Sequence, residues 1–389
     1  MSTIEDHTAN PLIDRADYFT NLPREFYVSK EVFDKELDAV YGRQWLYVAH
    51  VSEVPERGDY LAVELQGLGE SILVVRGDQD RVNAFYNVCR HRGYGICDAG
   101  AGKAKQFVCP YHRWSYGLDG RLLGAPAMPD GEYFNYADYG LKPVHLEVWN
   151  GFIFVNLSAE SPDPLAPRLE AVGSEMSRLD PEHLKVAHHV TYEMETNWKI
   201  LMENWMECSH CAGVHSGSLC APMDLPAIFS DVVEIFDAEE VGPMWIPIKE
   251  GMKTGSLNGE FVSSKLLGEF GRDAGSAPGF AAGFAIQPAI SGAIFWSDYG
   301  VMHRIDPVSP TRTQLQNWWF VREDAEEGKD YQLEELMALW DRTNSEDSVI
   351  VESQQRGVMS RGFTPGPHSL KRESSMRAAL VLYLEMMDA

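Results

Sequence analysis

Residues 87–120 read NVCRHRGYGICDAGAGKAKQFVCPYHRWSYGLDG, and this stretch holds two short loops that combine cysteine with histidine. Cys89 and His91 form a C-x-H pair, and Cys109 and His112 form a C-x-x-H pair after seventeen intervening residues. Because β-rich sequence flanks both pairs, we expect two neighbouring loops of a β scaffold to present the four side chains to one metal centre.

Two kinds of metal centre suit this ligand set. Two cysteines and two histidines can bind structural zinc, or they can bind a Rieske [2Fe–2S] cluster, in which the cysteines hold one iron and the histidines the other. Zinc fingers group their cysteines together and their histidines together, whereas here each loop supplies one of each. Mixed pairs let each loop contact both irons, so the sequence favours the Rieske cluster. Cys97, between the loops, is expected to be a buried small residue.

The sequence around these loops divides the chain into three parts. Residues 46–157 consist of short β-rich runs broken by turn signals such as GDQDR and LDGR, which predicts an all-β domain. Before it, apolar residues at helical spacing from Val32 predict a helix, with Ser29 as its N-cap. After it, the Pro-rich segment ESPDPLAP at 160–167 leads into a region that reads as an antiparallel sheet with packed helices, so the predicted class is α+β. The predicted parts are an N-terminal helical segment at 1–45 that packs on the third part, the all-β domain at 46–157, and a domain at 158–389.

Periodicity in the third part predicts particular elements. Amphipathic patterns indicate helices, and apolar runs rich in β-branched and aromatic residues indicate strands. The predicted helices cover 163–178, 197–212 and 331–356, and the predicted strands include 186–196, 230–236, 282–297 and 313–322.

The composition excludes several classes of partner. The 389 residues carry a formal net charge of −25, whereas binding to nucleic acid phosphates requires basic patches. The same acidity argues against anionic membranes as partners. The first thirty residues lack the apolar segment of a secretory signal, and no run reaches the roughly 18–20 apolar residues of a membrane span. We therefore expect a cytoplasmic protein that binds neither nucleic acid nor membrane.

A second group of metal-binding side chains lies in ENWMECSHCAGVH, residues 203–215. On a helix that begins after Thr196, Glu203, Glu207 and His210 would share one face, because they are spaced by four and three residues. His215 follows five residues later, after a glycine that is expected to end or bend the helix.

Two interpretations of this group compete. A zinc site would combine the histidines with Cys208 and Cys211, but Cys211 adjoins His210 in the sequence and is expected to point away from it. A chain with a one-electron carrier also needs an acceptor, and a mononuclear iron(II) held by two histidines and one carboxylate is such an acceptor. We therefore expect His210 and His215 to bind iron and the two cysteines to be packing residues.

Both groups resemble one known family. CRHRG followed by CPYHRWSYGLDG resembles the Rieske signature of ring-hydroxylating oxygenases, and NWK with EN-x-x-E-x-x-H-x₄-H resembles the mononuclear iron motif of the Rieske non-heme iron oxygenase α subunits. The resemblance implies a [2Fe–2S] cluster, a mononuclear Fe(II) and a catalytic domain with a helix-grip, START-like fold. It implies that the cluster is held by Cys89, His91, Cys109 and His112, and the iron by His210 and His215.

The resemblance extends to further residues near the iron. Glu207 matches the acidic residue that links the iron to the cluster of a neighbouring subunit, and Asn204 matches a position near the iron. SEDSVIVESQQRG, from residue 345, resembles the late helix that supplies a carboxylate ligand. Asp347 is the expected ligand, and the alternatives are Glu346 and Glu352.

Two positions depart from the family pattern. Ser209 precedes the first iron histidine where tyrosine is usual, which puts any role of that phenol in doubt. Arg113 follows the second cluster histidine where relatives usually carry glycine or a small residue. Its charge could raise the potential of the cluster, meet a redox partner or form an exposed salt bridge.

The resemblance also implies how electrons arrive. No G-x-G-x-x-G nucleotide fingerprint follows a strand in this chain. NAD(P)H is therefore expected to act indirectly, through a separate flavin and iron–sulfur reductase, with or without a ferredoxin. In this family the two sites of one chain are too far apart, which implies a head-to-tail homotrimer in which the cluster of one subunit serves the iron of the next.

The expected activity is that of a terminal oxygenase that hydroxylates a small organic substrate with O₂. FYVSKEVFDKELDAVYGRQWLYVAH and ENWMECSHC resemble the monooxygenase branch that acts on choline, glycine betaine, stachydrine and carnitine, in which hydroxylation of an N-methyl group leads to demethylation. Aromatic cages bind such cations, and the candidates are Trp245, Phe284, Phe295, Trp296, Tyr299, Trp318 and Trp319. The alternatives are a mono- or dioxygenase of an aromatic acid or ring, with Arg304 or Lys249 binding the acid, and a non-catalytic iron–sulfur electron-transfer protein.

Overall fold

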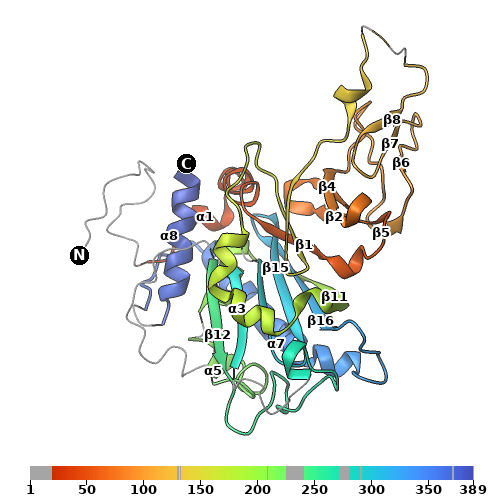
Figure 1. Cartoon of the computed structure of the whole chain (residues 1–389). Coiled ribbons are helices and arrows are strands. Elements are labelled where there is room, and N and C mark those ends of the chain that lie inside the picture. The colour runs from red at the N-terminus through yellow and green to blue at the C-terminus, as the bar shows by residue number, and fades with distance from the viewer. Residues whose placement is uncertain are drawn as a thin grey trace. The chain divides into compact units, whose positions relative to one another are not determined.

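The computed structural model describes residues 20–128, 131, 133–207, 209–224, 241–271, 280–289, 291–369 and 372–388. The chain forms two compact units (Figure 1). The small unit consists of residues 42–167 and 180–186, and the large unit contains the remaining residues.

The small unit consists mainly of short β-strands. Its central four-stranded sheet has the order β4–β3–β2–β5. Residues 72–75 of β3 are almost completely buried, because the apolar run ILVV is covered on both faces of the sheet. Two three-stranded sheets complete the unit, with the orders β1–β10–β9 and β6–β7–β8. The strands are β1 (Leu46–His50), β2 (Asp59–Leu65), β3 (Glu70–Arg76), β4 (Val82–Tyr86), β5 (Gly100–Lys103), β6 (Phe107–Val108), β7 (Ser115–Tyr116), β8 (Leu122–Gly124), β9 (His145–Trp149) and β10 (Phe152–Asn156).

The large unit is built on a six-stranded sheet with the order β11–β16–β15–β14–β13–β12. The strands from β12 to β16 follow one another as antiparallel neighbours. Because side chains alternate between the two faces of a strand, this register decides which residues share a face. The strands are β11 (Leu184–Met194), β12 (Val241–Pro247), β13 (Phe280–Ile286), β14 (Ser291–Phe295), β15 (Gly300–Ser309) and β16 (Arg312–Arg322).

Helices of the large unit pack on this sheet and on one another. In Figure 1, α3 lies in front of the sheet and α7 lies behind it. α3 contacts β13, whereas α4 contacts both β15 and α7. α8 contacts α4. The helices are α1 (Glu25–Val28), α2 (Lys30–Glu36), α3 (Glu170–Arg178), α4 (Trp198–Met206), α5 (Cys211–Val214), α7 (Leu333–Met359) and α8 (Ser374–Asp388).

Buried polar contacts connect α2 to α4 and α8. Lys199 on α4 is fully buried and pairs with Glu36 of α2 at 2.5 Å. Glu36 also accepts hydrogen bonds from Trp198 Nε1 (2.8 Å) and from the Tyr383 hydroxyl (2.6 Å). A buried charge without a partner is strongly destabilising, so this network fixes the N-terminal helices against the element that begins the second motif.

The structure confirms most of the predicted elements and corrects others. Ser29 caps α2, since its hydroxyl accepts a hydrogen bond from Val32 N (3.4 Å). The predicted helix 197–212 is wrong beyond Met206, where α4 ends. The predicted strand 282–297 is a pair of strands, β13 and β14, and the predicted strand 230–236 lies outside the described residues. The predicted α+β class, with an antiparallel sheet and packed helices, is confirmed.

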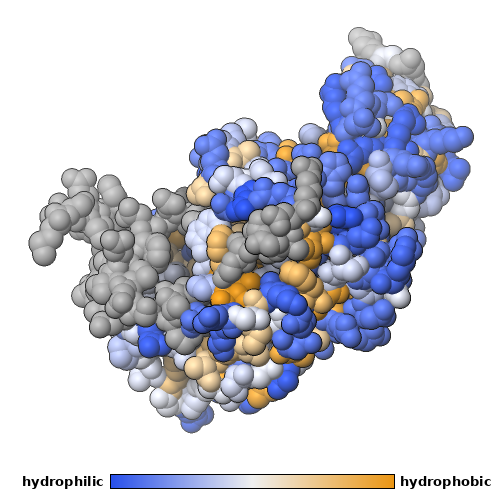
Figure 2. Space-filling view, turned by 60° about the horizontal axis from the view of Figure 1, so that its bottom comes forward, coloured by the Kyte–Doolittle hydropathy of each residue, from blue (hydrophilic) through white to orange (hydrophobic). Residues whose placement is uncertain are grey.

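Much of the surface is polar. Figure 2 shows a face on which hydrophilic residues prevail and hydrophobic residues gather near the centre. Among the helices that the structure describes, none is both long and apolar enough to cross a membrane.

Candidate metal centres

The two cysteine–histidine loops of the small unit share one backbone pattern. In each loop the amide of the cysteine donates to the carbonyl five residues later (2.8 Å), and the amide four residues later donates back to the carbonyl of the cysteine (3.0 Å). The same fold of the chain therefore presents both pairs of side chains. These bonds connect Cys89 with Gly93 and Tyr94, and Cys109 with Arg113 and Trp114.

Arg113 has a backbone conformation that favours glycine. The equivalent residue of the first loop is Gly93, with φ +74°, and Arg113 has φ +63°. A side chain in this left-handed region costs about 1–2 kcal/mol. The second loop therefore holds strain that the first loop avoids.

The four side chains of these loops meet in like pairs. The rings of His91 and His112 lie side by side, with centroids 4.5 Å apart. Cys89 and Cys109 are buried and within hydrogen-bonding contact of each other. Burial raises the pKa of the Cys109 thiol, while backbone amides of the loop donate to it and oppose this rise. Cys97 is partly buried and packs against the core instead.

This arrangement fits a Rieske cluster. The cysteines lie together and the histidines lie together, as two separate irons require. His91 Nδ1 is buried and has no hydrogen-bond partner among the described residues, so it is available to a metal. The His91 ring stacks on Trp114, with centroids 4.9 Å apart, which fixes its orientation.

The second motif, in the large unit, is not one continuous helix. α4 ends because Glu207 is extended, with φ −129° and ψ 158°. The Glu207 carboxylate accepts hydrogen bonds from Ser209 N and from His210 Nδ1, the latter at 2.6 Å. The prediction that Glu203, Glu207 and His210 share a helical face is therefore wrong, but Glu207 still contacts His210 through this turn.

Both histidines of the motif approach the same oxygen of Asp347. His215 Nε2 lies 3.0 Å from Asp347 Oδ1, and His210 Nε2 lies 3.5 Å from it. Asn204 Nδ2 lies 3.3 Å from this oxygen and 3.3 Å from His210 Nε2. Three elements, α4, the turn around α5 and α7, thus bring together the four residues that the sequence indicated.

The opposite nitrogen of each ring binds a carboxylate. Glu207 holds His210 Nδ1, and Glu346 holds His215 Nδ1 at 2.8 Å. These contacts place the proton on Nδ1 and leave the Nε2 lone pair for a metal. Of the alternatives to Asp347, Glu346 is thus on the far side of the ring, and Glu352 accepts a hydrogen bond from the Glu195 amide (3.2 Å).

The histidines and the carboxylate of this group shift the pKa values of one another, as is expected of neighbouring metal ligands. Burial lowers the pKa of His210, but the hydrogen bonds to Asp347 and Glu207 outweigh it and raise the pKa to about 9. Burial raises the pKa of Asp347, and the two histidines more than reverse this and hold it below its usual value. A metal ion binds these side chains in their deprotonated forms, and so takes the place of the protons that the two imidazoles would otherwise hold.

Cys211 lies nearer to the histidines than expected. Its Sγ is 3.9 Å from His210 Nε2, so the prediction that it points away is wrong. With His210 and His215 it forms a second set of three possible ligands. Its sulfur is in a disulfide bond, which leaves no thiolate for a metal. Cys208 lies outside the described residues.

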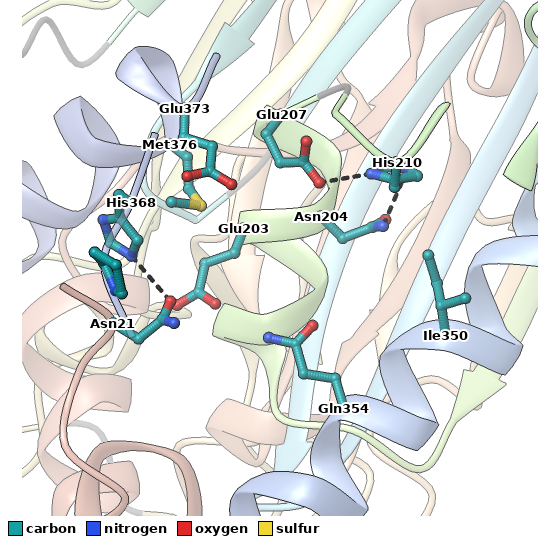
Figure 3. Close-up of a pocket in the computed structure, with 11 residues that line it drawn as sticks. Asn21, Glu203, Asn204, Glu207, His210, Ile350, Gln354, His368, Glu373 and Met376 are labelled. Atoms are coloured by element: carbon teal, nitrogen blue, oxygen red, sulfur yellow. Dashed lines mark hydrogen bonds and ion pairs between the residues drawn. The ribbon is translucent and has the colours of Figure 1, made fainter. Parts of the chain in front are cut away.

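A polar pocket of about 240 Å³ opens on the Glu207 side of His210 (Figure 3). In this view Glu207 and Asn204 point toward His210, and Glu203 lies between them and the Asn21–His368 pair. Burial raises the pKa of Glu203 to about 7, although the Tyr27 hydroxyl donates to its carboxylate (2.7 Å). The lining also includes Glu373 and His368, which the sequence analysis did not indicate. These two residues follow the motif by more than 150 residues, and only the folding of the chain brings them close to it.

The aromatic and basic candidates divide between the two faces of the sheet. Trp296, Tyr299 and Trp319 belong to the buried cluster that includes residues of α7. By strand alternation Phe284, Phe295 and Trp318 lie on the other face. Trp245 is 40% exposed. Arg304 is buried and pairs with Asp306 (2.7 Å), and Lys249 donates to the Cys220 carbonyl.

Family models match both units of the chain. The model described as "Rieske [2Fe-2S] domain" matches residues 44–143, and the model described as "Ring hydroxylating alpha subunit (catalytic domain)" matches residues 181–389. The second match alone covers more than half of the chain.

Individual relatives are similar over nearly the whole length. The chain is 34% identical to the glycine betaine monooxygenase oxygenase subunit of Chromohalobacter salexigens, over 95% of this chain and 86% of that protein. It is 30% identical to the carnitine monooxygenase oxygenase subunit of Escherichia coli (strain K12), over 88% and 85%. It is also similar to the crystal structure of the quaternary ammonium Rieske monooxygenase CntA in complex with L-carnitine, with a TM-score of 0.70, 25% identity, and coverage of 95% of this chain and 97% of that chain.

The strain at Arg113 gives a testable prediction. The substitution Arg113→Gly should raise the free energy of unfolding of the small unit by about 1 kcal/mol, because glycine adopts a positive φ without a steric cost. Urea unfolding followed by the visible absorbance of the iron–sulfur chromophore measures this change. The matched control is Arg92→Gly in the first loop, where φ is not positive and glycine brings no relief. Equal or lower stability of Arg113→Gly would contradict the account.

Proposed function

Because the chain belongs to the family of Rieske-type ring-hydroxylating oxygenase α subunits, we propose that it is the oxygenase subunit of a quaternary ammonium monooxygenase and removes an N-methyl group from a betaine. The chain is an oxidoreductase with a Rieske cluster and a non-heme iron, as its sequence predicted. The alternative of a non-catalytic electron-transfer protein is wrong, because the catalytic domain spans residues 181–389.

We assign the ligands from the contacts of the two centres. The observation that carries the assignment is that the Nε2 atoms of His210 and His215 both face Asp347 Oδ1. We propose these three residues as the iron ligands, and Cys89, His91, Cys109 and His112 as the cluster ligands. We also propose the division of the chain at 1–45, 46–157 and 158–389.

The remaining residues of the iron site have roles that follow from their contacts. When bound, the cluster passes single electrons and the iron activates O₂. Glu207 and Glu346 hold the Nδ1 protons and so keep both rings in the ligating tautomer. Asn204 donates toward Asp347, which helps hold that carboxylate in place. Because Glu207 also lines the open pocket, we propose it as the link through which electrons from a neighbouring cluster reach His210.

The names of the relatives support a betaine substrate. Hydroxylation of one N-methyl C–H bond uses O₂, two electrons and two protons, and yields an N-hydroxymethyl group and water. The C–N bond then breaks, so that formaldehyde leaves and a tertiary amine and a proton remain. An aromatic acid is less well supported, because Arg304 is paired with Asp306 and Lys249 lies at the surface.

The chain works with a reductase and in a multimer, as its family does. We propose a flavin and iron–sulfur reductase that carries electrons from NAD(P)H, and a head-to-tail homotrimer. The exposed surface around the cluster loops carries basic and aromatic residues, and the pocket beside His210 carries the carboxylates of Glu207 and Glu373, so the two surfaces are complementary in charge. The residues of the first surface are Arg92, Tyr94, Tyr111 and Arg113.

A substrate panel tests the proposed activity. With a surrogate reductase and NADH, glycine betaine or carnitine should give oxygen uptake and one formaldehyde for each O₂ consumed, whereas benzoate should give neither. The substitution Asp347→Ala should abolish turnover and leave the spectrum of the Rieske cluster unchanged, because it removes only an iron ligand. The control Glu352→Ala removes a carboxylate of the same helix that faces away from the iron site, and should retain turnover. Formaldehyde release by Asp347→Ala would contradict the ligand assignment.

Complementation tests the trimer. Cys109→Ser removes the cluster and Asp347→Ala removes the iron, so neither variant should turn over alone. Co-expressed at equal levels, they should regain about a quarter of the unmodified activity, because in a random cyclic assembly a quarter of the contacts join an intact iron to an intact cluster. Electron transfer within one chain predicts no recovery, and that result would exclude the head-to-tail arrangement.

A further inference from the structure

Five buried side chains beside α7 each carry a nitrogen without a hydrogen-bond partner among the described residues. None of them is more than 5% exposed. Buried polar groups are almost always hydrogen-bonded, so a group of unpaired nitrogens on one face of a sheet needs an explanation, and the binding of a polar ligand is one. We call these five residues the donor cluster. They are Trp296, His303, Asn317, Trp319 and Trp340.

The members of the donor cluster lie on one face of the sheet or pack against it. In the register of β15 and β16, His303 lies opposite Asn317 and Val301 lies opposite Trp319, so these side chains project to the same side. The ring of Trp340, on α7, lies 4.5 Å from that of His303 and 6.2 Å from that of Trp296. The rings of His303, Trp296 and Trp340 are therefore neighbours, and Asn317 adjoins them through its hydrogen bond to His303.

This face also borders the iron site. Trp340 precedes Asp347 by seven residues of α7, which is about two helical turns and returns to the same side of the helix. Trp205 follows Asn204 on α4, and its ring lies 5.9 Å from that of His303. The donor cluster is thus placed between the sheet and the two helices that supply Asn204 and Asp347.

The chemistry of these nitrogens selects an acceptor. An indole N–H can only donate a hydrogen bond, and three members are tryptophans. His303 Nδ1 donates to Asn317 Oδ1 at 2.9 Å, which leaves the Asn317 amide N–H₂ as a fourth donor and His303 Nε2 as the only acceptor. Burial lowers the pKa of His303 to about 4, so the ring is neutral. A ligand with two oxygens that only accept fits this set better than a hydroxyl.

The donor cluster also lacks a cation of its own. Arg304 follows His303 directly and therefore points to the opposite face, where it pairs with Asp306. A guanidinium near the substrate would attract a carboxylate but repel a quaternary nitrogen a few bonds away. Neutral indoles bind the carboxylate with their N–H groups, while their ring faces attract the cation. This combination suits a zwitterion.

We propose that the donor cluster binds the carboxylate of a betaine, with Asn317 and Trp319 as the specificity-determining donors. This inference rests on the proposed function and narrows the range of substrates that the enzyme is expected to bind. It predicts that the enzyme selects compounds that carry both a quaternary nitrogen and a carboxylate, and that choline, which carries a hydroxyl in place of the carboxylate, binds more weakly.

Calorimetric titration of the anaerobic, fully loaded enzyme tests the proposal without turnover. The probes are glycine betaine, choline and tert-butylacetate, which is the carbon isostere of glycine betaine without the positive charge. The substitutions Trp319→Phe and Asn317→Leu each remove one donor and should weaken glycine betaine binding by about ten- to a hundredfold, since hydrogen bonds to charged groups are strong. Choline binding should change less than threefold in the same variants.

Two controls distinguish the loss of a donor from a general effect of the substitution. Trp318→Phe is the same substitution at the neighbouring position on the opposite face, where the ring stacks on His189, and it should leave binding unchanged. An unaltered thermal midpoint of each variant excludes unfolding as the cause of lost binding.

The outcomes distinguish this inference from the proposed function. If Trp319→Phe and Asn317→Leu weaken choline as much as glycine betaine, or weaken neither, the donor cluster does not bind the carboxylate. If the unmodified enzyme binds tert-butylacetate as tightly as glycine betaine, and the variants lose both, the carboxylate site stands and the proposed cationic substrate is wrong. Binding of choline without binding of glycine betaine would overturn both the inference and the proposed betaine substrate. If the two donor variants leave glycine betaine bound as tightly as before while formaldehyde is still released from it, the inference alone fails.

Discussion

The hydrogen bonds from two imidazole Nδ1 atoms to Glu207 and Glu346 are the interaction on which the catalytic centre depends. Each bond fixes one ring and one tautomer, and so turns both Nε2 atoms toward Asp347. The two carboxylates come from different parts of the chain. Glu207 ends α4, and Glu346 lies on α7 next to the proposed ligand itself. The centre therefore requires α4 and α7 to be in contact, which they are.

The end of α4 at Glu207 allows the contact between Glu207 and His210. An extended residue at the end of α4 lets its carboxylate bind both Ser209 N and His210 Nδ1, which a continuous helix would prevent. The same carboxylate lines the acidic pocket of Figure 3. One residue thus orients a ligand and faces the surface at which we propose that a second subunit delivers electrons. The buried Glu36–Lys199 pair holds the beginning of α4 and so supports the position of its end.

The sequence predicted those parts of the sites that local spacing determines. The two cysteine–histidine loops, the Ser29 cap and the His210–His215 pair are local patterns, and the structure places each as a compact group. Where α4 ends could not be predicted, because the residues 197–206 are good helix formers and the break arises from side-chain contacts of Glu207. The face on which Trp318 or Trp319 lies depends on strand register, and the sequence alone does not give the register of β15 and β16. Glu373, His368 and the unpaired nitrogens of the donor cluster became apparent only from the tertiary packing.

Anomalous diffraction at the iron edge, from crystals of the loaded enzyme, tests the central claim most directly. The account predicts an anomalous peak in the large unit, bonded to His210 Nε2, His215 Nε2 and an Asp347 carboxylate oxygen, with no sulfur in its coordination sphere. It also predicts that each Nδ1 atom keeps its carboxylate partner in the loaded protein. A metal bonded to the sulfur of Cys211, or one that leaves Asp347 outside the coordination sphere, would contradict it.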